Sequence, residues 1–365
     1  MAAVGLRHAS LFDACAPDWF AVNIDRTVRL ANLVGQKTKE RDVKIKALLL
    51  LVVLLPQAAM LGAQSADTYP AKPIRFVVGF PPGGANDILA RLVGAKLQER
   101  FGQSVIVENK PGANAIIATE FVAKAAPDGY TLLIGASGAM TFNPGLYDKL
   151  PYDPVKDFAP ITMIGSFPLV LTVNPAIGAA SVKELVALAK SKPGMLNYGA
   201  GSTPFQLAAE LFKMQTGTDI KHVPYKGSAA TVAAVLAGEV GLTFVDSPPV
   251  VANIKAGKLR GLAVTSPRRA PILPDLPTVI EAGVPDFSVV LWTSLFAPAG
   301  TPVAILRKLQ GEIATIVHSA EIKERMAAIG IDPIGGTAED LAAQLRVDLE
   351  RWTKVSRTAG IKANP

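Results

Sequence analysis

The sequence predicts an α/β protein of two lobes, and three observations support that prediction. The chain has 365 residues, half of them hydrophobic, which is enough to give two ordinary domains a core each. After residue 66, short apolar runs alternate with longer segments of helical period, which is typical of βαβ units on a parallel sheet. A long apolar stretch at residues 157–175 interrupts this alternation, which then restarts. We therefore expect a second α/β unit inserted into the first.

The first 66 residues differ from the rest of the chain. Five basic residues between Lys37 and Lys46 precede nine apolar residues, Ala47 to Leu55, and the small-residue stretch GAQSA follows. A basic segment, a short apolar core and a small-residue exit are the three parts of a secretory signal peptide, and such a core is too short to span a bilayer. We predict that residues 1–66 are a mis-called start plus a cleaved signal peptide, and that the mature protein is periplasmic. A short buried helix is the alternative.

The first lobe is predicted to comprise residues 67–167 and 266–365. Apolar runs rich in β-branched residues predict its strands, and segments with a 3.6-residue period predict its helices. In chain order these are PIRFVVGF (strand), ANDILARLVGAKLQERF (helix), SVIVEN (strand), IIATEFVAKAA (helix), YTLLIGAS (strand) and three C-terminal helices, PVAILRKLQGEIATIVHS, AEIKERMAAIG and AEDLAAQLRVDLERWTKVSRTAG.

The second lobe is predicted to comprise residues 168–265. The same patterns give, in order, SVKELVALAKS (helix), LNYG (strand), FQLAAELFKMQTG (helix), IKHVPY (strand), AATVAAVLAGE (helix), GLTFVD (strand) and VVANIKAGK (helix). LVLTVN and LRGLAVTS are expected to cross between the lobes as hinge strands.

Charge and thiol content exclude several functional classes. The only cysteine, Cys15, lies in the leader, so the exported protein would have neither a disulfide nor thiol chemistry. The chain after Ala66 keeps 29 basic and 25 acidic residues, a net charge of +4, without a run of five basic residues, which argues against nucleic acid as a partner. His222 and His318 lack the spacing of metal ligands, so we expect no metal and no cofactor.

Ligands of open α/β sheets bind beyond the carboxyl ends of the strands, so the loops that leave strands are candidate sites. FPPGGAND runs from the first strand into the start of a helix, where free N–H groups and the helix dipole favour an anion. Gly83 and Gly84 would let a ligand approach the backbone. A plain βα turn explains this composition equally well. Asn86 or Asp87 could cap the helix, and Asp87 is expected to pair with Arg91.

Two further loops and one carboxylate complete the candidate site. GASGAM and YGAGSTP are small, bare loops after strands, and neither completes a catalytic or dinucleotide motif. Asp246 ends a strand and could face a cleft, although capping of the following helix is the simpler explanation. The predicted ligand-binding residues are Phe80, Pro82, Gly83, Gly84, Ala85, Asn86, Asp87, Ser137, Gly138, Gly201, Ser202, Thr203 and Asp246.

A secreted hydrolase or isomerase is an alternative from a different functional class. It would need an acid, a base or a nucleophile with an orienting partner. The available side chains are Asp87, His222, Tyr225, Lys226 and Asp246, and nothing in their spacing pairs them. We therefore expect no enzymatic activity and no catalytic residue.

Nine stretches, in order from Tyr69 to the C-terminal helix, resemble the Bug family of extracytoplasmic solute-binding proteins, the receptors of tripartite tricarboxylate transporters. They are YPAKPIRFVVGFPPGGANDILAR, VIVENKPGA, APDGYTLL, YDPVKDFAPIT, AAELFK, HVPYKG, IKAGKLRGLAVTS, LPDLPTVIEAG and FAPAGTP. The resemblance implies a type II periplasmic-binding-protein fold that closes over its ligand like a hinged clamp. It also implies that the loop matching FPPGGAND helps to hold a carboxylate through backbone groups and ordered water.

The resemblance further implies a monomer whose partners are a small carboxylate ligand and the membrane subunits of a tripartite transporter. A sensor that passes its ligand state to a signalling partner is the alternative within binding proteins. Three features depart from the family pattern. Asn114 and Ala115 stand where the family usually has a glycine pair, the loop YGAGSTPFQ is shorter than usual, and Gln206 replaces a histidine. The identity of the ligand is therefore not inferred from any relative.

Overall fold

The computed structural model describes residues 68–358, so the leader predicted for residues 1–66 lies outside the described residues. The strands are β1 Ile74–Val78, β2 Val105–Asn109, β3 Thr131–Ala136, β4 Phe158–Val173, β5 Asn197–Ala200, β6 Lys221–Pro224, β7 Leu242–Asp246, β8 Arg260–Val264, β9 Val290–Pro298 and β10 Asp332–Pro333. The helices are α3 Ala85–Phe101, α4 Ile116–Ala123, α5 Asn143–Leu146, α6 Val182–Ser191, α7 Thr203–Thr216, α8 Gly227–Ala237, α9 Pro248–Lys255, α10 Val303–His318, α11 Ala320–Ala327 and α12 Ala338–Thr358.

The strands are hydrogen-bonded in the order β2-β1-β3-β9-β4-β7-β5-β6, and β8 and β10 also pair with β4. The predicted parallel βαβ units are present at both ends of this order, where β1 pairs with β2 and β3 and β5 pairs with β6 and β7. The centre is antiparallel, because β9 returns from the C-terminal part of the chain and inserts between β3 and β4. The expectation of a parallel sheet is therefore wrong for the centre, and β9 was not predicted at all.

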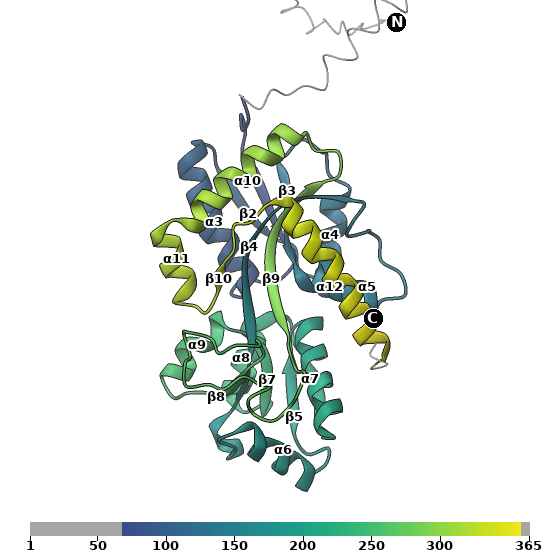
Figure 1. Cartoon of the computed structure of the whole chain (residues 1–365), viewed down its shortest axis with the longest axis vertical. Helices are drawn as coiled ribbons and strands as arrows, with labels where there is room; N and C mark the ends of the chain where they lie inside the picture. The colour runs from purple at the N-terminus through teal and green to yellow at the C-terminus, as the bar shows by residue number, and fades with distance from the viewer. Residues whose placement is uncertain (1–67, 359–365) are drawn as a thin grey trace, which may run out of the picture. The chain divides into compact units, whose positions relative to one another are not determined.

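Strand β4 belongs to both halves of this arrangement. Its first part pairs with β9 and β10, and its last five residues, Leu169 to Val173, pair with β7 and β8 (Figure 1). We call β1–β3, β9 and β10 with α3–α5 and α10–α12 the first lobe, and β5–β8 with α6–α9 the second lobe. The residue boundaries given above for the two lobes stay a prediction.

Helices cover both faces of the first-lobe sheet, because apolar side chains of its strands point alternately to the two faces. In β1, Phe76 and Val78 pack into one core with side chains of α3 and α10, such as Leu89 and Ile305, whereas Val77 packs into a second core with side chains of α4 and α12 such as Leu341. Since residues two apart share a face of a strand, a nearly continuous apolar strand supplies both cores.

Two helices of the second lobe, α7 and α8, begin beside the start of α3 in the first lobe. Phe212 of α7 and Phe244 of β7 anchor its core, with ring centroids 5.5 Å apart. Helices α7 and α8 begin just beyond the carboxyl ends of β5 and β6, as α3 begins beyond that of β1. The N-termini of three helices therefore lie at the carboxyl ends of parallel strands, which is the usual ligand position in open α/β sheets.

Candidate functional site

A pocket lies where these three helix starts meet, lined by residues of both lobes. The free volume between its walls is about 30 Å³, room for one or two water molecules in this arrangement of the lobes. Eight of the thirteen predicted residues line it: Phe80, Gly84, Asn86, Asp87, Ser137, Gly138, Ser202 and Asp246. The structure therefore gathers residues from all the predicted loops and the predicted strand end, and their contact with a ligand stays a prediction.

The other five predicted residues, Pro82, Gly83, Ala85, Gly201 and Thr203, are not on the pocket wall. Four of them make contacts that hold the loops together, and that of Gly83 with Asp87 is described below. The Thr203 hydroxyl donates to Asn143 Oδ1 in the first lobe over 3.1 Å. Gly201 packs so tightly that a Cβ would stand 2.3 Å from the Gly227 oxygen. The Ala85 N–H donates across to the second lobe, as described below.

No side chain of the first lobe caps the start of α3. Its N-cap residue is Gly84, and neither Asn86 nor Asp87 caps it, so that expectation is wrong. Among the described residues, the N–H groups of Gly84, Asn86 and Asp87 have no hydrogen-bond acceptor. Because the first turn of a helix leaves such donors free and its dipole favours negative charge, this start can hold an anion.

Asp87 holds the FPPGG loop in place instead of capping the helix. Its Oδ1 accepts from Arg91 Nε and Asn109 Nδ2, each over 3.0 Å, and its Oδ2 accepts from the Gly83 N–H over 3.1 Å. The same Asn109 nitrogen donates to the Phe80 oxygen. Burial opposes ionisation of Asp87, but these hydrogen bonds and the Arg91 charge outweigh it and lower its pKa. The predicted ion pair with Arg91 is confirmed at 2.9 Å.

The starts of α7 and α8 add further free donors. Within the described part of the chain, the N–H groups of Thr203 and Phe205 in α7 and of Ser228 and Ala229 in α8 have no acceptor. Phe205 and Ser228 also line the pocket. One pocket is thus surrounded by three helix starts with free donors. The start of α3 belongs to the first lobe, and those of α7 and α8 belong to the second.

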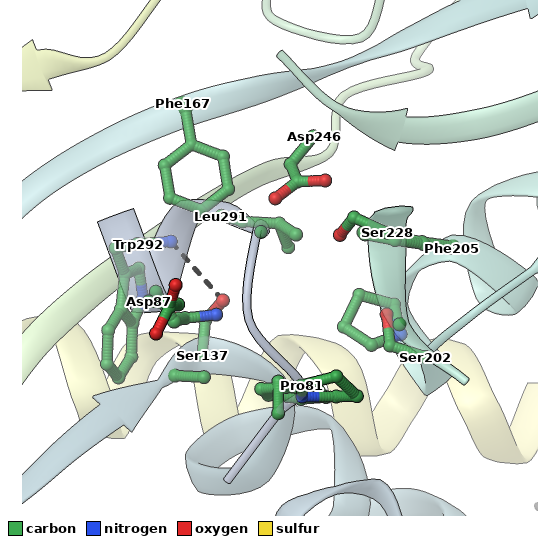
Figure 2. Close-up of a pocket in the computed structure, with 17 residues that line it drawn as sticks. Pro81, Asp87, Ser137, Phe167, Ser202, Phe205, Ser228, Asp246, Leu291 and Trp292 are labelled. Carbon is green, nitrogen blue, oxygen red and sulfur yellow. Dashed lines mark hydrogen bonds between the residues drawn. The ribbon is translucent and has the colours of Figure 1, made fainter. Parts of the chain in front are cut away.

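Asp246 is the second carboxylate of the pocket, and it is 3 % exposed. Its Oδ2 accepts the Ala85 N–H over 2.6 Å, so it caps α3 in the opposite lobe and not the helix that follows it. Its Oδ1 has no partner. Burial raises the pKa of Asp246, partly opposed by the Ser228 hydroxyl and the Ala85 N–H. Figure 2 shows the Ser228 hydroxyl directed toward this carboxylate.

The rest of the wall is mostly apolar. Phe167, Phe205, Leu291 and Trp292 line it, and its lining includes no Lys, Arg or His among the described residues. The backbone N–H of Trp292 donates to Ser137 Oγ over 3.3 Å, shown as the dashed line in Figure 2. Neutral donors and aromatic surface without a cation suit a small organic anion of low charge.

Several wall residues were missed from sequence. They are Pro81, Ala136, Phe167, Pro204, Phe205, Gly227, Ser228, Leu291 and Trp292. Gly227 and Ser228 open a helix directly after a strand, the signal used for the other loops, so they could have been found. Leu291 and Trp292 lie on β9, whose place between β3 and β4 no local pattern indicates.

The residues considered for an enzyme do not assemble. Asp87 and Asp246 line the pocket, whereas His222, Tyr225 and Lys226 do not. His222 stacks on Tyr198 with ring centroids 5.0 Å apart, and burial lowers its pKa. The Tyr225 hydroxyl donates to Glu239 Oε2 over 3.3 Å.

Asn114 and Ala115, which stand in place of the usual glycine pair, lie in a segment of unfavourable backbone conformation. Ala113, Asn114 and Ala115 all have positive φ, of 45°, 52° and 70°. This left-handed region favours glycine, which the family usually has at the last two positions. The Asn114 side chain donates to the Tyr147 hydroxyl over 2.7 Å, and its backbone oxygen accepts from Asn143. These bonds hold the segment in its unfavourable conformation.

Residues 68–358 contain neither a metal-binding cluster nor a membrane-spanning helix. His, Cys, Asp and Glu side chains in that range form no group of three or more that could hold a metal ion. None of the helices there is long and apolar enough to cross a membrane.

Comparison with known proteins gives consistent matches over most of the chain. The model of the tripartite tricarboxylate transporter family receptor matches residues 89–361. Protein BugT of Bordetella pertussis is 36% identical over 320 residues, which are 87% of this chain and 98% of BugT. The solved structure of R. palustris Rpa4515 with adipate is 38% identical and covers 80% of this chain and 99% of its own, with a TM-score of 0.79. The structure of MatC from Rhodopseudomonas palustris with bound malate is 30% identical, with a TM-score of 0.75. It covers 79% of this chain and 99% of its own.

Proposed function

Because this chain belongs to the tripartite tricarboxylate transporter receptor family, we propose that it is a periplasmic receptor for a small carboxylate-bearing molecule, which it delivers to a tripartite membrane transporter. Relatives solved with adipate and malate support a carboxylate ligand. The two-lobed fold supports a receptor that closes over what it binds. Its homologues are solute-binding receptors, which supports binding without catalysis.

One observation carries the proposal: the starts of α3, α7 and α8, which have free N–H groups, line a single pocket, and no described residue on its wall is cationic. Such donors bind a carboxylate without the desolvation cost of burying Arg or Lys. A receptor must also release its ligand, and neutral donors make the bound anion easier to release than a buried ion pair would.

A ligand screen tests the proposal directly. The protein is produced from the full-length chain, unfolded and refolded to remove carried ligand, and heated with each of a panel of carboxylates, amines, sugars and peptides. Ligand at 100 times its dissociation constant stabilises a protein by about 2.7 kcal/mol, enough to raise the melting temperature by several degrees. We expect such a shift with a carboxylate, and recovery of that acid unchanged. Shifts only with other classes, or conversion of the acid, would contradict the proposal.

Substitution of Gly84 by Val tests the position of the site. Gly84 has a φ of −92°, so its backbone tolerates a side chain, but an added Cβ would stand 3.0 Å from Ser228 Oγ and 3.4 Å from Asp246 Oδ2. We expect at least about tenfold weaker binding of the carboxylate found in the screen, equivalent to about 1.4 kcal/mol. The matched control is Gly311→Val in α10, where an added Cβ meets nothing within 4 Å. Equal affinities of the two variants would place the ligand elsewhere.

Delivery to a transporter is tested in cells. Loss of the gene should abolish uptake of the labelled acid across the membrane. Normal uptake with a lost transcriptional response to the acid would favour the sensor instead.

A further inference from the structure

One polar atom in the pocket is left without a partner. Asp246 Oδ1 is buried, accepts no hydrogen bond, and belongs to a residue that lines the pocket. Its companion oxygen already accepts the Ala85 N–H, and the Ser228 hydroxyl, although directed toward this carboxylate, makes no hydrogen bond to Oδ1. Buried polar atoms in native proteins are nearly always hydrogen-bonded, so this acceptor points to a missing donor.

The charge of Asp246 also has no counterpart. Arg91 pairs with Asp87, the other carboxylate of the pocket, at 2.9 Å. No cation lines the pocket beside Asp246 in the described chain. A ligand carboxylate bound at the start of α3 would therefore share a dry pocket with an uncompensated carboxylate, and like charges in such a place repel strongly.

A donor on the ligand itself would resolve both problems. We propose that Asp246 is a specificity-determining residue, which selects carboxylates that carry a hydrogen-bond donor near the carboxylate, an ammonium group above all and a hydroxyl group next. This inference rests on the proposed function, because it takes a carboxylate to occupy the free N–H groups. The ligand's ammonium or hydroxyl group then donates to Asp246 Oδ1.

The apolar wall of the pocket favours a ligand whose remaining part is apolar. Phe167, Phe205 and Trp292 offer surface to a hydrocarbon or aromatic group and supply no side-chain cation to a second carboxylate. The substrate class is thus a 2-amino acid with an apolar side chain, followed by the corresponding 2-hydroxy acid. An acid without a donor leaves Asp246 Oδ1 unpaired and binds more weakly.

Sets of three acids with one carbon skeleton test the inference in the wild-type protein. They are propanoate, lactate and alanine; succinate, malate and aspartate; and 3-phenylpropanoate, 3-phenyllactate and phenylalanine. Dissociation constants are measured by calorimetry on the refolded full-length protein. In the tightest-binding set, we expect the amino acid to bind with at least tenfold higher affinity than the unsubstituted acid. The affinity of the hydroxy acid should lie between these two.

Each result of this comparison decides something. Unsubstituted acids that bind as tightly as their amino and hydroxy counterparts would mean that water satisfies Asp246 Oδ1, which overturns the inference and leaves the proposed function intact. If no carboxylate binds at all, in these sets or in the wider screen, the proposed function fails and the inference fails with it.

Asp246→Asn identifies the residue responsible. Asparagine keeps an acceptor for the Ala85 N–H but removes the charge, so the ratio of affinities for amino and unsubstituted acids should fall to near one. The matched control, Asp275→Asn, changes an exposed carboxylate outside the pocket and should keep the wild-type ratio. An unchanged ratio in D246N would overturn the assignment. If D246N does not fold, the wild-type comparison decides alone.

Discussion

Two carboxylates meet the start of α3 from opposite lobes, and their surroundings differ. Asp87 of the first lobe accepts three hydrogen bonds and pairs with Arg91, and its pKa is lowered. Asp246 of the second lobe has one oxygen bound to the Ala85 N–H and one with no partner, and burial raises its pKa. One aspartate is thus part of the scaffold, whereas the other keeps an acceptor for something outside the protein.

The contrast extends to the walls that carry them. On the first-lobe side, Asn109 joins Asp87 to the Phe80 oxygen, so the FPPGG loop is fixed before any ligand arrives. The second-lobe wall reaches the first lobe through single contacts, such as those of Asp246 and Thr203. A fixed donor wall facing a wall with unused polar groups suits a clamp whose closure depends on its ligand.

The largest expected effect is on the first-lobe wall. Asp87→Ala removes the acceptor of the Gly83 N–H, one of the two acceptors of Asn109 Nδ2, and the ion-pair partner of Arg91. We expect a loss of about 3 kcal/mol in the free energy of unfolding, measured by urea titration, because three partly buried donors lose a charged acceptor. Asp275→Ala, at an exposed position, should change it by less than about 0.5 kcal/mol. Similar values for the two variants would mean that Asp87 is not part of the scaffold.

An intermediate effect concerns the pH dependence of stability. The folded pKa of Asp246 is raised, so between its unfolded value near 4 and its folded value the folded state binds more protons. The free energy of unfolding therefore falls as pH rises through that interval, by about 1.4 kcal/mol for each unit of the shift. Asp246→Asn removes this titration, so its stability relative to wild type should rise with pH and then level off.

Asp87 should show the opposite sign. Its folded pKa is lowered, so its stabilising contribution is present above the unfolded value near 4 and is lost as pH falls through the folded value. Urea titrations of wild type, D246N and Asp87→Asn at a series of pH values compare the two. A difference between D246N and wild type that is independent of pH would contradict the unpaired state of Asp246.

The smallest expected effect lies behind the first-lobe wall, at Ala115. Its φ of 70° costs a residue with a Cβ about 1 kcal/mol or more, and the extra chain entropy of glycine offsets part of that. We expect Ala115→Gly to gain up to about 1 kcal/mol in the free energy of unfolding. Ala118→Gly, inside α4, should lose about 1 kcal/mol. A loss at Ala115 as large as at Ala118 would show that packing of its Cβ outweighs strain.

Local patterns were sufficient for most elements but not for the centre of the sheet. The parallel units follow from apolar runs and helical periods, and the loops that leave their strands do reach the pocket. Strand β9 escaped prediction because its partners, β3 and β4, lie more than a hundred residues earlier in the chain. With β9 missed, Leu291 and Trp292 were missed from the pocket as well.

The role of Asp246 was equally beyond local reasoning. A carboxylate at a strand end before a helix predicts a cap for that helix. The structure bonds it instead to Ala85, 161 residues away in sequence. Only the folded arrangement of the two lobes makes that pairing, and with it the unpaired oxygen. The Asp87–Arg91 pair, four residues apart on one helix, needed no such information.

The most direct test of the central claim is a crystal structure of the protein with the acid found in the screen. We expect the ligand carboxylate to lie within about 2.7–3.2 Å of the N–H groups of Gly84, Asn86 or Asp87 at the start of α3. A carboxylate held by a Lys or Arg side chain, or bound away from the start of α3, would contradict it.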